Sequence, residues 1–222
     1  MHWLDPDHLP EISGRFERFL LNPHGDADGM ILSDGTEVHF PPHMSAELCA
    51  TIRPGEKPEV RIRGVRPRNG SLIAAIAIET MDGKRIVDNG PPKKHAEKER
   101  PNKDGPKPKH EKMQAEGRIR QVLHGPKGEA RGALLEDGRI VRFPPHEAER
   151  IADLIMVGAR LAVRGEGLTN SVGTVIEARE IGASDETLRR VEGNKPEHDR
   201  KLKHGKPKGA KAPASSDNGR AV

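Results

Sequence analysis

Four arginines are the residues best placed to do chemistry, because strand alternation puts them on one outer face of the second half of the chain: Arg120, Arg131, Arg139 and Arg142. A guanidinium group donates a planar fork of hydrogen bonds to phosphate and stacks on nucleobases, so such a face suits single-stranded nucleic acid. The alternative is a solvated charged face on which these arginines pair across strands with Glu129 or Glu177.

A second basic cluster is the segment RIRGVRPRNG, which carries Arg61, Arg63, Arg66 and Arg68. We expect it to form the loop between the fourth and fifth strands of the first half, where it could contact the same strand of nucleic acid. The matching segment RGEGLTNSVG in the second half is nearly neutral. A loop that merely keeps the protein in solution is the alternative interpretation.

The other reactive side chains favour structural roles. His39 and His43 flank a Phe-Pro-Pro sequence, but Arg142 replaces the first of them in the second FPPH motif, so no metal site and no cofactor is predicted. Cys49 is the single cysteine, which excludes an intramolecular disulfide and indicates a buried thiol. The sequence contains no phosphate-binding glycine loop, nucleophile elbow or HExxH motif, and we expect a protein that is not an enzyme.

An internal repeat must position these residues. Residues 14–43 read GRFERFLLNPHGDADGMILSDGTEVHFPPH, and residues 117–146 read GRIRQVLHGPKGEARGALLEDGRIVRFPPH. At a constant offset of 103 positions, 15 of these 30 residues are identical, so the chain contains two copies of one unit. The copies differ in charge on the predicted outer face, where Glu17, Asp28, Thr36 and His39 correspond to the four arginines.

Each copy predicts five short strands and one helix. Phe16 and Phe19 are three residues apart, which indicates a β-bulge in the first strand. Asp-Gly supplies a tight hairpin turn before the third strand, on which Val38 and Phe40 face inward. Apolar residues then recur at helical spacing after Pro-Pro. The predicted ranges include first strands at 15–21 and 118–124, second strands at 26–33 and 129–136, helices through Met44, Leu48 and Ile52 and through Ala148, Ile151 and Ile155, and fifth strands at 71–79 and 174–181.

This order of elements resembles the OB-fold superfamily. The repeated DG-x-x-V-x-FPPH signature is similar to that of a bacterial OB-fold family of uncharacterised proteins, and it brings no catalytic residues with it. We therefore expect an all-β chain with two tandem OB-fold-like five-stranded barrels. The predicted organisation is an N-terminal extension (1–13), OB-like domain 1 (14–81), a basic disordered linker (82–115), OB-like domain 2 (116–183) and a basic disordered tail (184–222).

The positive charge lies outside the predicted barrels. Residues 82–113 carry ten basic and six acidic side chains, and residues 186–222 carry ten and five, which gives +4 and +5 against a total of +4. The remainder of the chain is therefore mildly acidic, at −5. The acidic N-terminal residues and the lack of a long apolar run predict a soluble, cytoplasmic protein without a membrane span.

These observations predict a non-enzymatic protein that binds single-stranded DNA or RNA, held largely by electrostatics and with low sequence specificity. Aromatic platforms for base stacking are scarce, since Trp3 is the one candidate for an exposed ring. The alternative is a protein-interaction or scaffold module without direct nucleic-acid contact.

Overall fold

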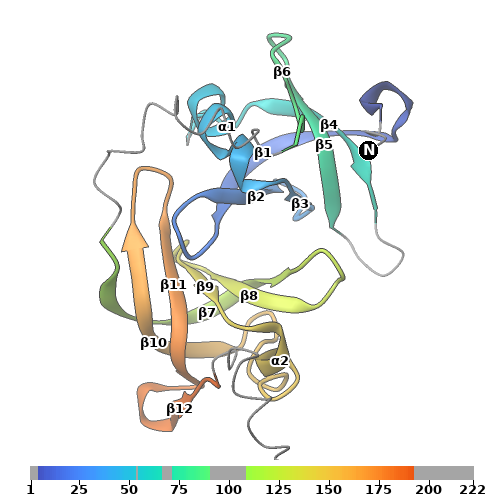
Figure 1. Ribbon diagram of the computed structural model, residues 1–222. Coiled ribbons are helices and arrows are strands. Elements are labelled where there is room, and N and C mark those ends of the chain that lie inside the picture. The colour runs from blue at the N-terminus through green and yellow to red at the C-terminus, as the bar shows by residue number, and fades with distance from the viewer. Residues whose placement is uncertain (1–4, 54, 67–71, 91–108, 193–222) are drawn as a thin grey trace, which may run out of the picture. The chain divides into compact units, whose positions relative to one another are not determined.

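The computed structural model describes residues 5–53, 55–66, 72–90 and 109–192, which form two β-barrels (Figure 1). The first barrel contains η1 (Pro6–His8), β1 (Glu11–Leu21), β2 (Ala27–Leu32), β3 (Glu37–His39), η2 (Pro42–Met44), α1 (Ser45–Thr51), β4 (Glu59–Val65), β5 (Ile73–Thr80) and β6 (Arg85–Val87). The second contains β7 (Glu111–His124), β8 (Ala130–Leu135), β9 (Ile140–Arg142), α2 (Pro145–Ala148), β10 (Arg160–Thr169), β11 (Thr174–Gly182), η4 (Asp185–Thr187) and β12 (Arg189–Arg190).

Five strands close into a ring in each barrel. In the first barrel β1 pairs antiparallel with both β2 and β4, β2 pairs with β3, and β4 pairs with β5. A parallel contact between β3 and β5, with Val38 opposite Ile73, completes the ring. The second barrel repeats this order, and Val141 of β9 lies opposite Ile176 of β11. This is the OB-fold order, so the predicted fold is confirmed.

The bulge predicted in the first strand is present. Residues 11–15 of β1 pair with β4 and residues 16–21 pair with β2, so one strand bends to serve two partners. The register shifts between Phe16 and Arg18, and the extra residue brings Phe16 and Phe19 to the same inner side. Their ring centroids lie 4.7 Å apart in the core. The second barrel has the corresponding shift between Ile119 and Gln121.

The repeated turns and core positions also follow the sequence. Gly35 and Gly138 adopt φ values of 85° and 89°, as the predicted Asp-Gly turns require. Phe40 and Phe143 are buried in the two cores, as alternation predicts. Helix α1 packs its buried Leu48 against the first core.

The helix of the second copy is shorter than predicted. Helix α2 ends at Ala148, although Ile151 and Ile155 are buried as an amphipathic helix would bury them. The chain beyond α2 folds as successive single turns: the N–H of Ile151 donates to Glu147 O, and the N–H of Ile155 donates to Ile151 O. The apolar spacing therefore predicted the buried side chains correctly but not a continuous helix.

Ordered strands extend into segments that the sequence assigned to the linker and the tail. Strand β6 pairs with β5, and β12 pairs with β11, so each barrel carries a sixth strand. Strand β7 begins at Glu111, where it lies opposite Gly167 of β10. The surrounding charged sequence hid these strands, although Ile86 of β6 is buried in the core of the first barrel. Residues 91–108 of the predicted linker and 193–222 of the predicted tail lie outside the described residues.

The histidine of each FPPH motif contacts the segment that follows the sixth strand. His43 Nε2 lies 3.0 Å from Asp88 Oδ1, and His146 Nε2 lies 2.6 Å from the backbone oxygen of Glu192. Both contacts are local and structural, in line with the role predicted for these histidines. Among the described residues, no helix has the length and apolar character needed to cross a bilayer.

Candidate nucleic-acid interface

Arg142 does not lie on an open face. Its side chain is 6% exposed, its Nε donates to Leu21 O at 2.9 Å, and its Nη2 lies 2.8 Å from Asp28 Oδ1. Burial lowers the pKa of this guanidinium, and the Asp28 carboxylate opposes that effect. The prediction that this arginine is available to a ligand is wrong, because the first barrel covers the wall on which it lies.

Two of the other predicted arginines are held by protein oxygen atoms. Arg120 Nη2 lies 2.5 Å from Glu17 Oε1 in the first barrel. Arg139 donates from Nε to Asp137 Oδ2 at 2.7 Å and from Nη1 to Gln114 O at 3.1 Å, both within the second barrel. These contacts match the alternative interpretation, in which the arginines pair with neighbours, although the partners are not Glu129 or Glu177.

Arg131 differs from the other three. It projects from β8 and is exposed. Within the part of the chain that the structure describes, its side chain makes no hydrogen bond or ion pair. It is therefore the one member of the predicted face that remains available to an anion among the described residues.

The basic cluster of the first barrel is divided between a strand and a loop. Arg61 and Arg63 lie within β4, where they alternate with Val60 and Ile62, whose side chains are buried in the core. Their predicted placement in a loop is therefore wrong. Arg61 Nη2 lies 3.0 Å from Glu79 Oε1, and Arg63 Nη2 lies 2.7 Å from Glu11 Oε2. Arg66 follows the strand and is exposed, and Arg68 lies outside the described residues.

The outer walls of the two barrels contact each other. We define the first wall as the outer side chains of β1, β2 and β3 with their turns, and the second wall as those of β7, β8 and β9. Arg18 Nη1 donates to Gly138 O at 3.1 Å, and Gln121 Nε2 donates to Gly35 O at 3.0 Å. Because Gln121 corresponds to Arg18 and Gly138 to Gly35, the two bonds are related by an approximate two-fold axis.

Apolar side chains fill the space between the walls. Ile31 and its counterpart Leu134 are 1% and 0% exposed, and Leu134 belongs to the core cluster of the first barrel. Leu168 and Val175 of the second barrel join the same cluster. The surface on which OB-folds usually hold ligands is therefore buried between the two barrels.

A carboxylate is buried in this contact. Glu37 of β3 is 1% exposed, and it accepts hydrogen bonds from the backbone N–H of His124 at 3.0 Å and lies 2.9 Å from His39 Nε2. Burial raises the pKa of Glu37, but its bonds with His124 and His39 outweigh that effect and hold the pKa below the usual range. The hydrogen bond with Glu37 in turn raises the pKa of His124.

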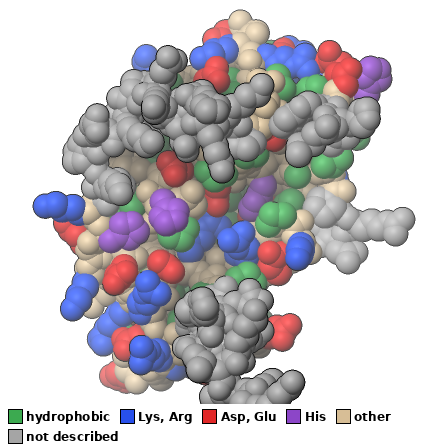
Figure 2. All heavy atoms as spheres, viewed as in Figure 1, with side chains coloured by type: hydrophobic (Ala, Val, Ile, Leu, Met, Phe, Trp, Pro, Cys, Tyr) green, Lys and Arg blue, Asp and Glu red, His purple; other side chains and the backbone are tan. Residues whose placement is uncertain are grey.

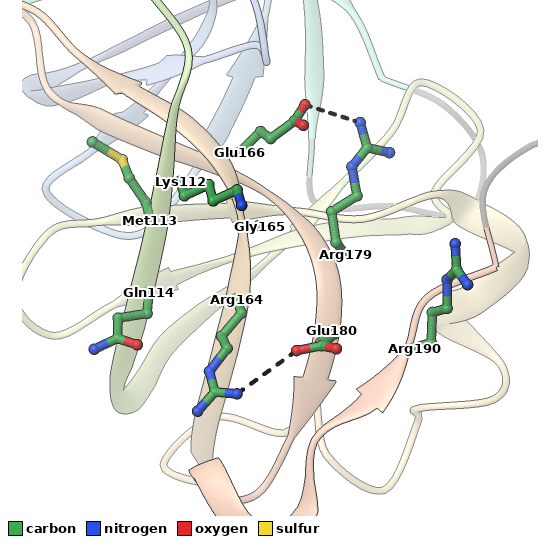
Figure 3. Close-up of a pocket in the computed structure, with 9 residues that line it drawn as sticks. All are labelled: Lys112, Met113, Gln114, Arg164, Gly165, Glu166, Arg179, Glu180 and Arg190. Atoms are coloured by element: carbon green, nitrogen blue, oxygen red, sulfur yellow. Dashed lines mark hydrogen bonds and ion pairs between the residues drawn. The ribbon is translucent and has the colours of Figure 1, made fainter.

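The second barrel also has a groove that the sequence did not indicate. It lies on the outer side of β7, β10 and β11 (Figure 3). Its volume is about 580 Å³. Nine residues line it: Lys112, Met113, Gln114, Arg164, Gly165, Glu166, Arg179, Glu180 and Arg190. Four cations and two carboxylates thus surround one hollow in the second barrel.

The ion pairs between residues that line the groove are long and exposed, although Arg164 Nη2 also pairs closely with Asp185, which does not line it. Arg179 Nη2 lies 3.4 Å from Glu166 Oε2, and Arg164 Nη1 lies 4.0 Å from Glu180 Oε2, with each side chain about half exposed. Figure 3 shows these pairs spanning the curved strands β10 and β11. Pairs of this kind contribute little stability, so an incoming phosphate could replace the carboxylate.

The face of the molecule shown in Figure 2 mixes both signs of charge. Figure 2 shows lysine and arginine side chains interspersed with acidic ones rather than gathered in one broad patch. All four phenylalanines are buried, and Trp3 lies outside the described residues. The described residues therefore expose no phenylalanine, tyrosine or tryptophan ring for base stacking.

Comparisons with known proteins add little to this picture. No family model and no curated protein matches the chain. Two crystal structures of the single-stranded DNA binding protein from Thermus aquaticus, a deletion variant and the wild type, are similar to it at 14% and 13% sequence identity. The matches cover 84% of this chain and 96% and 94% of those chains, with TM-scores of 0.24 and 0.23. The OB-fold assignment comes from the strand order and the parallel pairs that close the barrels.

Proposed function

We propose that the protein is a non-enzymatic binder of single-stranded DNA or RNA, with largely electrostatic affinity and low sequence specificity. The observation that carries this proposal is the groove of the second barrel, where Lys112 and Arg190 join Arg164 and Arg179 around one hollow. Lys112 and Arg190 make no side-chain ion pair among the described residues. A phosphate would therefore gain the most binding energy from these two side chains, because it need not displace a carboxylate from them.

The chemistry of the groove favours phosphate over bases as the recognised group. Guanidinium and ammonium groups are donors only, and they bind phosphate oxygens whatever the neighbouring base. Strong stacking would require an exposed phenylalanine, tyrosine or tryptophan ring, and none is exposed among the described residues. Binding through the sugar-phosphate backbone gives low specificity and strong dependence on salt.

The basic sequence outside the barrels supports the same proposal. Residues 91–108 and 193–222, which lie beyond the strands of the two barrels, carry net charges of +3 and +5, and each neutralised phosphate releases counterions. Arg66 and Arg131 add exposed cations on the two barrels. The usual OB wall is not needed in this arrangement, because the groove lies on β10, β11 and the part of β7 that pairs with β10 rather than with β8.

Fluorescence anisotropy with labelled oligo(dT) and oligo(rU) would test the proposal. We expect binding at about 50 mM salt and a loss of 10- to 1000-fold in affinity by about 200 mM. The variant K112E/R190E should bind more weakly than the wild type. Its control is R53E/R160E, which makes the same change in net charge at exposed positions outside the groove.

A protein-interaction or scaffold role is the second candidate. It is favoured by the burial of both OB walls against each other, and by the exposed apolar pair Met156 and Val157, which are 58% and 69% exposed. No oligonucleotide binding at about 50 mM salt would exclude the first proposal. In that case, a partner retained from nuclease-treated lysate would support the second.

A further inference from the structure

We propose that the first and second walls are a heterotypic recognition pair: each barrel binds the other kind of barrel and rejects a copy of itself. The partner of the first wall is thus the second wall of the other repeat copy. The barrels then form a stable pair without the chain that connects them, whether or not the protein binds nucleic acid.

The first argument is the symmetry of the contact. Positions that correspond in the two copies meet across an approximate two-fold axis, as Arg18 to Gly138 O and Gln121 to Gly35 O show. Contacts of this isologous kind are characteristic of dimers of identical subunits. The walls therefore have the geometry of a homodimer, although the two barrels no longer carry the same side chains.

The second argument is the charge at the axis. Glu17 and Arg120 are corresponding residues, and they pair with each other at 2.5 Å. Two first barrels joined in the same way would place Glu17 against Glu17. Two second barrels would place Arg120 against Arg120. Like charges at one position destabilise both homotypic pairs, while the observed pair is neutral.

A second ion pair, at a separate position, also disfavours a pair of two second barrels. Arg142 contacts Asp28, and the residue that corresponds to Asp28 in the second copy is Arg131. A pair of second barrels would therefore bring Arg142 against Arg131. Because Arg142 is 6% exposed, that repulsion would be poorly screened by solvent.

The buried carboxylate of Glu37 also disfavours a pair of two first barrels. Glu37 is satisfied by His124, whose counterpart in the first copy is Leu21. A pair of first barrels would offer Glu37 a leucine in place of the imidazole. A buried carboxylate that loses such a partner is costly, so this pairing is disfavoured as well. The opposite charges at corresponding positions of the two copies thus favour pairing of a first barrel with a second barrel.

The full chain with a specific protease site inserted between residues 91 and 108 would test the proposal. The protein is folded first, cut, and then examined by native mass spectrometry and size-exclusion chromatography. We expect the two fragments to remain together as a 1:1 complex of one first and one second barrel. Fragments that separate at micromolar concentration, or that form homodimers, would overturn the proposal.

Charge exchange provides the sharper comparison. The E17R variant should weaken the association of the cut barrels by about tenfold or more, and E17R/R120E should restore it to within about threefold of the wild type. E116R/R160E exchanges an exposed pair inside the second barrel and should leave the association unchanged. Circular dichroism before cutting confirms that each variant is folded; if E17R is not, E17Q replaces it. Equal association of E17R and wild type would refute the charge argument.

Discussion

Arg142 Nε donates to the backbone oxygen of Leu21 at 2.9 Å, and this bond joins the third strand of one barrel to the first strand of the other. The residue that corresponds to Arg142 in the first copy is His39, which lies 2.9 Å from Glu37 within its own strand. One repeat position thus makes a contact between barrels in one copy and a local contact in the other. The duplication has diverged at the surface where the copies meet.

Replacing Arg142 should destabilise the protein more than replacing an exposed arginine. R142M keeps much of the side-chain volume but leaves Asp28 and Leu21 O without their donor. We expect the free energy of unfolding to fall by about 2–3 kcal/mol, since hydrogen bonds to charged groups are involved and the site is buried. Urea denaturation followed by circular dichroism measures the change.

The matched control for that prediction is R160M. Arg160 also pairs with a carboxylate, Glu116, but its side chain is 65% exposed. Exposed pairs contribute less than about 1 kcal/mol, so this variant should remain close to the wild type. Equal losses in R142M and R160M would contradict the burial of Arg142 between the barrels.

The pH dependence of stability should reflect Glu37 and His124. The hydrogen bond with Glu37 raises the pKa of His124, so its contribution is complete below the ordinary histidine pKa of about 6.5 and is lost as the pH rises through the raised value. The lowered pKa of Glu37 acts in the other direction: its contribution is present above about 4.5 and is lost as the pH falls through the lowered value. Stability from this pair is therefore greatest between about pH 4.5 and 6.5.

Unfolding free energies measured at about pH 6 and about pH 9 check this expectation. The wild type should lose stability between the two values, and H124Q should lose less, because glutamine does not titrate. His39, Arg142 and Glu129 also act on this site and remain in both proteins. H24Q replaces an exposed histidine as the control and should keep the wild-type dependence. A parallel loss in H124Q and wild type would contradict the assignment.

The fold was predictable because its determinants are local. The bulge at Phe16, the turns at Gly35 and Gly138 and the inward Phe40 each depend on residues a few positions apart. The repeat doubled the evidence for every element. What the sequence could not show was that one barrel covers the other.

The prediction of an accessible arginine face was wrong at Arg142 for a physical reason. Alternation correctly places Arg142 on the outer face, but outward is not the same as exposed when the covering residues lie 121 positions away. The opposite charges of the corresponding residues Glu17 and Arg120 were a sequence signal that the two barrels pair with each other. The groove was missed because Lys112 and Arg190 lie in segments that composition assigned to the linker and the tail.

Gly165 should be intolerant of any side chain. A Cβ atom there would lie 1.9 Å from Glu177 O and 2.9 Å from its carbonyl carbon, at the position where β10 shifts register against β11. Because these atoms are backbone of β11, they leave little room to relax, so G165A should destabilise the second barrel by about 1–3 kcal/mol. Thermal unfolding followed by circular dichroism measures the effect. The control is G117A, whose Cβ would meet only the Leu135 side chain at 3.6 Å, and a loss as large in G117A would contradict the argument.

The salt dependence of nucleic-acid binding should report how many groove cations contact phosphate. Each cation that neutralises a phosphate on a single strand adds about 0.7 to the slope of log affinity against log salt. If Lys112 and Arg190 each hold one phosphate, K112A/R190A should reduce that slope by about 1.4. R53A/R160A removes two exposed cations elsewhere and should leave the slope unchanged. Equal slopes in K112A/R190A and the wild type would show that the groove is not the phosphate site, even if the protein binds nucleic acid by other residues.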